Sequence, residues 1–267
     1  MTANFSINRL GQLIRKQWIE NSRWYLYSSL AIVGLLGIVF TFWLFSNNGY
    51  YQEDVIYIFF LVGLFISGAI FASVSFSSLG DKAKATYWLS FPASHLEKLL
   101  CHIFYCVIVF TAVYFLCFFA VRSLVMLYIN DMVARYPDEY RFIPLQNKAE
   151  FWQMYRAFIY GYFGVQAFYL MGSVFFPRLS IIITSAVGAA IVIIFITFLA
   201  ILNKAMFPEQ TGWSWNIFYI DHYQGLADIH RYQLSPFWQG TITFLIKFIW
   251  APVFWLIAWV RLKEKQV

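Results

Sequence analysis

Residues 179–202 read LSIIITSAVGAAIVIIFITFLAIL and contain no charged side chain. The hydrocarbon core of a bilayer is about 30 Å thick, so a spanning helix needs about 20 mainly apolar residues. A lone strand would leave its backbone groups unpaired in lipid, so the segment must be helical. This stretch therefore predicts a transmembrane helix.

The rest of the chain repeats this character, and together the apolar stretches predict six spans, at residues 24–45, 55–78, 99–128, 155–176, 179–202 and 241–260. The third stretch exceeds a minimal span, so we expect it to tilt or to project beyond the bilayer. Composition agrees, since 61% of the 267 residues are hydrophobic and 12% are charged. Soluble domains are about half apolar and about a quarter charged. We expect an all-α membrane protein, with one transmembrane domain over residues 1–267.

The basic residues predict the orientation of the spans. Of the 19 Lys and Arg residues, 11 lie before the first span, in alternate connections and after the last span. Nine of the 13 acidic residues lie on the other side. The excess of Lys and Arg in cytoplasmic segments then places both termini in the cytoplasm. The net charge of +6 does not indicate a nucleic-acid partner, because the basic residues flank apolar segments and form no continuous patch.

The first 23 residues contain an amphipathic stretch, residues 5–20, with the sequence FSINRLGQLIRKQWIE. Ile7, Leu10, Ile14 and Trp18 recur at helical spacing, and basic residues take the other side. This pattern is typical of an interfacial helix on the cytoplasmic leaflet. The alternative is a polar lead-in whose periodicity is accidental.

Residues 79–98, LGDKAKATYWLSFPASHLEK, form the longest internal cytoplasmic loop. Ser94 and Glu97 have the spacing of a capping box, and Pro92 disfavours helix at Phe91. A new helix should therefore begin near Ser94. The preceding residues form an aromatic and basic element that is either an interfacial anchor or a docking surface for a cytoplasmic partner: Asp81, Lys82, Lys84, Tyr87, Trp88, Leu89 and Phe91.

Residues 203–240, between the fifth and sixth spans, are external and rich in Trp, Tyr and Phe. A free aqueous loop would not keep so many rings in water. We expect short helices that dip into the outer leaflet or cap the helical bundle.

No catalytic, cofactor-binding or metal-ligating residue is predicted. The chain lacks G-x-x-x-x-G-K-[ST], G-x-S-x-G, H-E-x-x-H and C-x-x-C motifs. Asp221, His222, Asp228 and His230 lie close together in sequence, but their spacing matches no metal motif and ordinary polar residues explain them as well.

Two charged residues fall inside predicted spans, Arg122 in the third and Lys247 in the sixth. Such charges either snorkel to the outer headgroups or face an internal pathway and contact an anionic part of a transported molecule. Both interpretations stay open for each residue. Glycine pairs such as Gly34/Gly37 and Gly161/Gly164 would allow close helix contact, although such spacings are common by chance.

The order of these parts resembles the permease subunit of type-2 ATP-binding-cassette (ABC) exporters. YWLSFPASHLEKLL, residues 87–100, is similar to the loop that opens the third span in the Bacteroidetes members of that family. The resemblance implies that the N-terminal helix is an elbow helix and that the loop around Asp81–Phe91 docks on a separate ATPase. It also implies that residues 203–240 gate the exit. Residues 129–153 are longer than the family pattern, which leaves the boundaries of the third and fourth spans open.

The resemblance implies an exporter of the bacterial inner membrane, in which two permease chains act with two ATPase subunits among membrane lipids. The permeases would form a homodimer or a heterodimer, and the substrate stays open. Two other functions remain in view: a membrane-embedded enzyme that modifies lipid, and a non-catalytic scaffold or sensor. The lipid enzyme would need convergent acids or histidines, and the group at Asp221–His230 is its only candidate in the sequence.

Overall fold

The computed structural model describes residues 5–146, 148–206, 219–223 and 229–265. The described chain is mostly helical, and six of its helices are long and apolar enough to cross a membrane. The protein is therefore a multi-pass membrane protein. The helices with this character are Ile7–Ser46, Glu53–Val74, His95–Arg135, Phe151–Phe175, Ser180–Leu202 and Pro236–Glu264.

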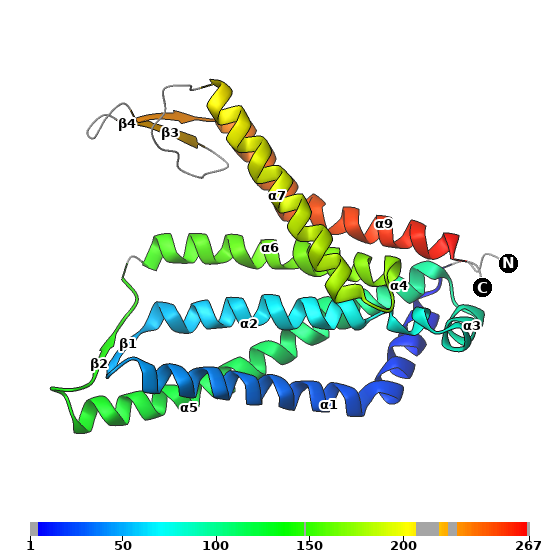
Figure 1. Cartoon of the computed structure of the whole chain (residues 1–267). Helices are drawn as coiled ribbons and strands as arrows, with labels where there is room; N and C mark the ends of the chain where they lie inside the picture. The colour runs from blue at the N-terminus through cyan, green and yellow to red at the C-terminus, as the bar shows by residue number, and fades with distance from the viewer. Residues whose placement is uncertain (1–4, 147, 207–218, 224–228, 266–267) are drawn as a thin grey trace. The chain divides into compact units, whose positions relative to one another are not determined.

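The chain divides into two compact units, and the first contains residues 1–181 and 251–267. Its elements, shown in Figure 1, are α1 (Ile7–Ser46), β1 (Tyr50–Gln52), α2 (Glu53–Val74), the 3₁₀ turn Ser77–Gly80, α3 (Lys82–Ser90), α4 (His95–Ile103), the π-helical segment Phe104–Val109, α5 (Phe110–Arg135), β2 (Arg141–Ile143), α6 (Lys148–Phe175) and nearly all of α9 (Trp250–Glu264).

The second unit contains residues 182–250. Its elements are α7 (Ser180–Met206, apart from its first residues), β3 (Tyr219–Tyr223), β4 (Ile229–Gln233), α8 (Pro236–Phe244) and the π-helical segment Leu245–Ile249. That segment lies just before Pro252. A proline has no N–H for the carbonyl four residues earlier, which here is that of Phe248, so the regular helix pattern cannot continue unchanged.

Interlocked aromatic rings fill the core of the first unit, between α1, α2, α5 and α6. Phe60 of α2 meets Phe118 edge-on, with ring centroids 4.8 Å apart, and the Tyr114 hydroxyl donates to the Phe60 carbonyl at 3.0 Å. Glycines let these rings approach the α2 backbone. A Cβ at Gly63 would overlap the Tyr114 hydroxyl, and one at Gly68 would overlap the Tyr162 ring.

Close contacts thus occur at Gly63 and Gly68, and not at three of the glycines singled out from the sequence. A Cβ at Gly34, Gly37 or Gly161 would meet no atom within 4 Å. The spacing of small residues indicates where helices can approach, but only the opposing side chain decides where they do.

Two short strands join distant parts of the first unit. β1 follows α1, and it pairs in parallel with β2, with Tyr50 opposite Arg141 and Gln52 opposite Ile143. The turn before β1 uses two left-handed residues, Asn48 (φ 44°) and Gly49 (φ 87°). The charged segment 129–153 therefore contains the end of α5 at Arg135, this second strand and the start of α6 at Lys148, which gives the ends of the helices that contain the third and fourth spans.

The amphipathic N-terminal stretch is not a separate helix. Its residues and the first predicted span form one continuous helix, α1. Figure 1 shows the first turns of α1 running at an angle to the rest, so the direction changes without a break in the helix. The sequence shows no Pro or Gly between residues 12 and 33 that would end the helix.

The prediction of short helices in residues 203–240 was wrong for part of this segment. Residues 219–223 and 229–233 form an antiparallel hairpin, with Tyr219 opposite Gln233 and Tyr223 opposite Ile229. Tyr and Ile favour strands, and a hairpin satisfies the backbone groups of both segments by pairing them. Among the described residues of the segment, 203–206 complete α7 and the helix α8 begins at Pro236, while residues 207–218 and 224–228 lie outside the described chain.

We expect Gly63→Ala to destabilise the protein by about 1–3 kcal/mol, because the added methyl must displace the hydrogen-bonded Tyr114 hydroxyl. Gly161→Ala is the matched control, since it adds the same methyl to a helix where nothing lies within 4 Å. It should be neutral or slightly stabilising. Thermal unfolding of both variants in detergent micelles checks this, and equal unfolding temperatures would contradict the packing at Gly63.

Candidate functional site

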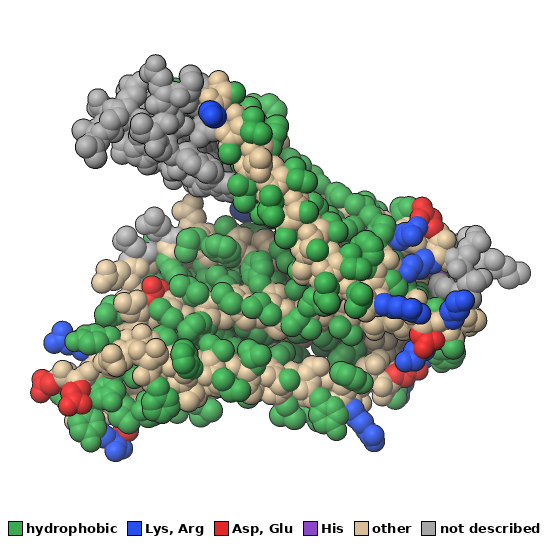
Figure 2. Space-filling view, viewed as in Figure 1, with side chains coloured by type: hydrophobic (Ala, Val, Ile, Leu, Met, Phe, Trp, Pro, Cys, Tyr) green, Lys and Arg blue, Asp and Glu red, His purple; other side chains and the backbone are tan. Residues whose placement is uncertain are grey.

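One end of the first unit brings together the start of α1, the short helix α3, the start of α4 and the end of α9 (Figure 1). We call it the basic end, because the Lys and Arg residues that these elements carry gather there, as Figure 2 shows. They include Arg9, Arg15, Lys16, Lys82, Lys84, Lys98, Arg261 and Lys263.

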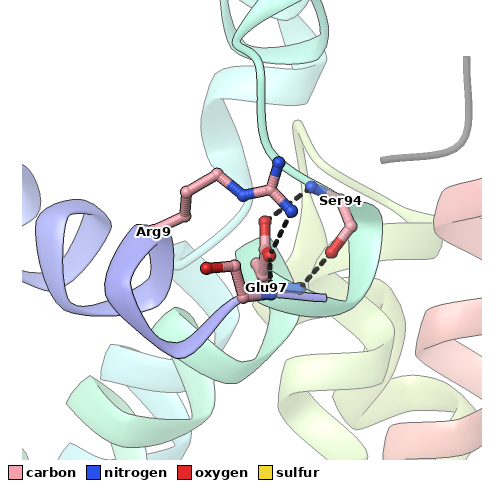
Figure 3. A network of polar contacts seen from close by, with 4 residues as sticks. Arg9, Ser94 and Glu97 are labelled. Carbon is pink, nitrogen blue, oxygen red and sulfur yellow. Dashed lines mark hydrogen bonds and ion pairs between the residues drawn. The ribbon is translucent and has the colours of Figure 1, made fainter. Parts of the chain in front are cut away.

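A buried carboxylate ties the chain's amino-terminal segment to α4 at this end (Figure 3). The Glu97 side chain has no exposed surface, and its Oε1 accepts from the Ser6 backbone N–H at 2.7 Å and from Arg9 Nη2 at 3.1 Å. Its Oε2 accepts from the Ser94 N–H at 2.8 Å, and the Ser94 hydroxyl accepts from the Glu97 N–H at 3.2 Å. The capping box predicted from the sequence is confirmed.

The position of Glu97 explains how its charge can be buried. It stands in the first turn of α4, where the unpaired N–H groups of a helix favour a negative charge. The guanidinium of Arg9 and the two backbone donors supply the hydrogen bonds that replace water. The sequence indicated Glu97 as a cap but not as the partner of Arg9, since no local spacing links residues 88 positions apart.

The short helix α3 begins at Asp81, whose carboxylate accepts from the Ala83 N–H at 2.9 Å. Lys82, Lys84 and Tyr87 are exposed along this helix. Together with Asp81, these residues give α3 an outward face with two positive charges, one negative charge and one large ring. Leu89, also predicted as a docking residue, has a side chain outside the described part of the structure.

The remaining two aromatic residues of the predicted docking element point inward. Trp88 packs on the core cluster that α2, α4, α6 and α9 share, with its ring edge-on to Phe76 at 5.7 Å. Lys98 donates to the Trp88 carbonyl at 2.9 Å. Phe91 is half-buried beneath Lys16 of α1, whose Nζ lies 3.9 Å from the ring centroid. These residues attach α3 to the bundle, so they support the docking face without forming it.

A second contact holds the turn that precedes α3. Arg178, in the connection between α6 and α7, donates from Nε to the Gly80 carbonyl at 2.9 Å. A side chain at Gly80 would place Cβ 2.9 Å from Arg178 Cγ, so the two segments lie in direct contact. The helix α3 is thereby linked to the bundle on both sides.

The opposite end of the unit contains Arg122, which the sequence left as either a snorkelling or a pathway residue. Its Nη2 lies 3.7 Å from Glu53 Oε1, and the guanidinium carbon lies 5.7 Å from the Tyr57 ring centroid. Glu53 Oε2 also accepts from the Leu145 N–H at 3.0 Å. Arg122 thus faces α2 inside the unit, where Glu53 balances its charge.

Beside this ion pair lies an open pocket of about 480 Å³, lined by residues of the β1–α2 and β2–α6 segments, including Gln52, Asp54, Leu145 and Phe151. Lys247, the other candidate pathway residue, lies in the second unit on the π-helical segment Leu245–Ile249, and its side chain is exposed. Neither its pathway role nor its snorkelling role is tested by this position.

The described residues contain no group of three or more His, Cys, Asp or Glu that could hold a metal ion. The backbones of Asp221, His222 and His230 belong to the β3–β4 hairpin, where His222 and His230 are opposite each other. Their side chains and the whole of Asp228 lie outside the described part of the chain, so this candidate site stays a prediction.

We expect Glu97→Met to destabilise the protein by about 1–3 kcal/mol, because it leaves the partly buried N–H groups of Ser6 and Ser94 without the carboxylate that accepts from them. Glu264→Met is the control, since Glu264 makes only an exposed pair with Arg261. Thermal unfolding in detergent measures both. An unfolding temperature for Glu97→Met equal to that of the control would refute the tethering role.

Comparison of the chain with protein-family models, with curated proteins and with solved structures gave no match.

Proposed function

We propose that this chain is the permease subunit of an ABC-type exporter in the inner membrane of a bacterium. In this proposal it moves a substrate outward, and a separate ATPase subunit, present in two copies, supplies the energy. A second permease chain, identical or related, completes the pathway. The chain itself contributes no catalytic residue.

The observation that best supports the proposal is the way in which α3 is attached to the helical bundle. A short helix between two spans, with exposed lysines and with Trp88 packed into the bundle, suits a contact that transmits force. Trp88 joins α3 to the cluster formed by Ala72, Leu170 and Leu262, from three spanning helices. A push on the exposed face would therefore reach α2, α6 and α9 directly.

The charge distribution supports a cytoplasmic location for this face. Six spans return the chain to the side on which it began, and α3 lies at the same end as the start of α1 and the end of α9 (Figure 1). The basic residues gathered there favour the cytoplasmic side, where an ATPase would find its nucleotide.

The docking face is tested by reversing its charges without disturbing its attachment. We expect Lys82→Glu/Lys84→Glu to abolish co-purification of an ATP-hydrolysing subunit in mild detergent and to stop ATP-dependent transport. Tyr87 is left intact because its hydroxyl accepts a hydrogen bond from Lys16 of α1. Trp88 and Phe91 are left intact because they hold α3 in place.

Lys263→Glu, on an exposed basic residue at the same end, is the control and should retain the partner. A double variant that folds and still retains the ATPase would show that docking occurs elsewhere. A wild-type protein that carries no ATPase would favour a scaffold or a lipid enzyme instead.

Orientation is tested separately with single cysteines. We expect a membrane-impermeant maleimide to label Glu139→Cys in intact spheroplasts, but to label Lys84→Cys only after permeabilisation. Both positions are exposed, whereas Cys101 and Cys106 are buried and Cys117 is half-buried, so the background should be low. Labelling of Lys84→Cys in intact cells would reverse the proposed topology.

A further inference from the structure

A small pocket of about 60 Å³ lies at the basic end between α1 and the α3–α4 segment. One wall is a single face of α1, whose residues are spaced by three and four positions. The other wall consists of aromatic and polar residues of α3 and α4. The lining residues are Leu13, Lys16, Gln17, Glu20, Tyr87, Trp88, Phe91, Lys98, Cys101 and His102.

Two lysines from different helices converge on this pocket. Lys98 is only 4% exposed, and its Nζ lies 4.9 Å from the Trp88 ring centroid. The Lys16 side chain is 29% exposed, and its Nζ also lies 3.3 Å from the Tyr87 hydroxyl. The one carboxylate in the lining is that of Glu20, 3.7 Å from Lys16 and half-exposed. The lining therefore carries an excess of positive charge among aromatic faces, which favours an anionic ligand.

The size of the pocket limits the ligand. A cavity needs about 10–15 Å³ of space open to a water-sized sphere to hold one water molecule. A volume of about 60 Å³ therefore accommodates a group as large as a phosphate but not a nucleotide.

The surroundings indicate where that phosphate comes from. On α1, beside the pocket residues, Trp18, Ile19 and Trp24 are 51%, 64% and 73% exposed. Exposed Trp near the end of a spanning helix is typical of the headgroup level, with acyl chains against the apolar surface beyond it. A phosphate with attached acyl chains would thus find both of its parts matched by neighbouring surfaces.

We propose that this pocket binds the phosphate of an anionic phospholipid, such as phosphatidylglycerol, between Lys16 and Lys98. The bound headgroup would neutralise the excess charge and bridge α1 to α3. The site does not depend on the proposed transport function, since its two lysines belong to α1 and α4 and not to the exposed face of α3. Tyr87 belongs both to the pocket and to that face.

Native mass spectrometry of the intact protein in detergent, titrated with phosphatidylglycerol, tests the proposal. The decisive variant is Lys16→Gln, because Lys16 is partly exposed and its loss should not affect folding. Removal of one lysine near a headgroup should weaken phosphatidylglycerol binding about fivefold. Lys98→Gln should do the same if its thermal unfolding without lipid matches that of the wild type.

Lys84→Gln removes the same charge from the exposed face of α3 and should leave the affinity unchanged. An equal loss in Lys84→Gln, or no loss in Lys16→Gln, would overturn the proposal. So would equal affinity for phosphatidylcholine. Inorganic phosphate is the last comparison, and displacement of the lipid by phosphate at equal concentration would identify a free-anion site instead of a lipid site.

Discussion

The buried carboxylate of Glu97 is the interaction on which the arrangement of the basic end depends. A carboxylate without exposed surface is tolerated only where hydrogen bonds and a positive charge replace water. Here the donors are two backbone N–H groups and Arg9, and they come from α4 and from the start of α1. The need to satisfy one charge therefore fixes the angle at which the amino-terminal segment meets the bundle.

Because Glu97 holds the start of α1 against α4, α3 can be rigidly attached to the bundle and still keep one side exposed. Its inward residues join the core shared by several spanning helices, and the Gly80–Arg178 hydrogen bond holds its leading turn. A nine-residue helix has little stability alone, so this packing is what keeps it folded. The exposed charges of α3 are then available to a partner. Lys16 of α1 and Lys98 of α4 face the pocket between α1 and the α3–α4 segment.

The sequence predicted the features that depend on composition or on the spacing of nearby residues. It did not predict contacts between residues that are far apart in the chain. All six spans follow from apolar length, and the Ser94–Glu97 capping box follows from a three-residue spacing.

The inward direction of the Trp88 side chain could not be predicted, because the aromatic residues of α3 are adjacent in sequence and show no helical period. The Arg9–Glu97 and Glu53–Arg122 pairs each join residues far apart in sequence, so nothing local indicated them. The β3–β4 hairpin was missed because its aromatic content was read only as affinity for the membrane interface.

The two ends of the first unit are held by different means, and this bears on how it can move. At the basic end side chains make the ties, through Glu97, Trp88 and Arg178. At the opposite end the backbone pairing of β1 with β2 and the Glu53–Leu145 hydrogen bond join the α1–α2 connection to the α5–α6 connection. These helices could separate only if the β1–β2 hydrogen bonds broke and the packed rings around Phe60 moved apart. The helices concerned are α1, α2, α5 and α6. These four helices should therefore move as one body. A force applied at α3 would then displace the body as a whole.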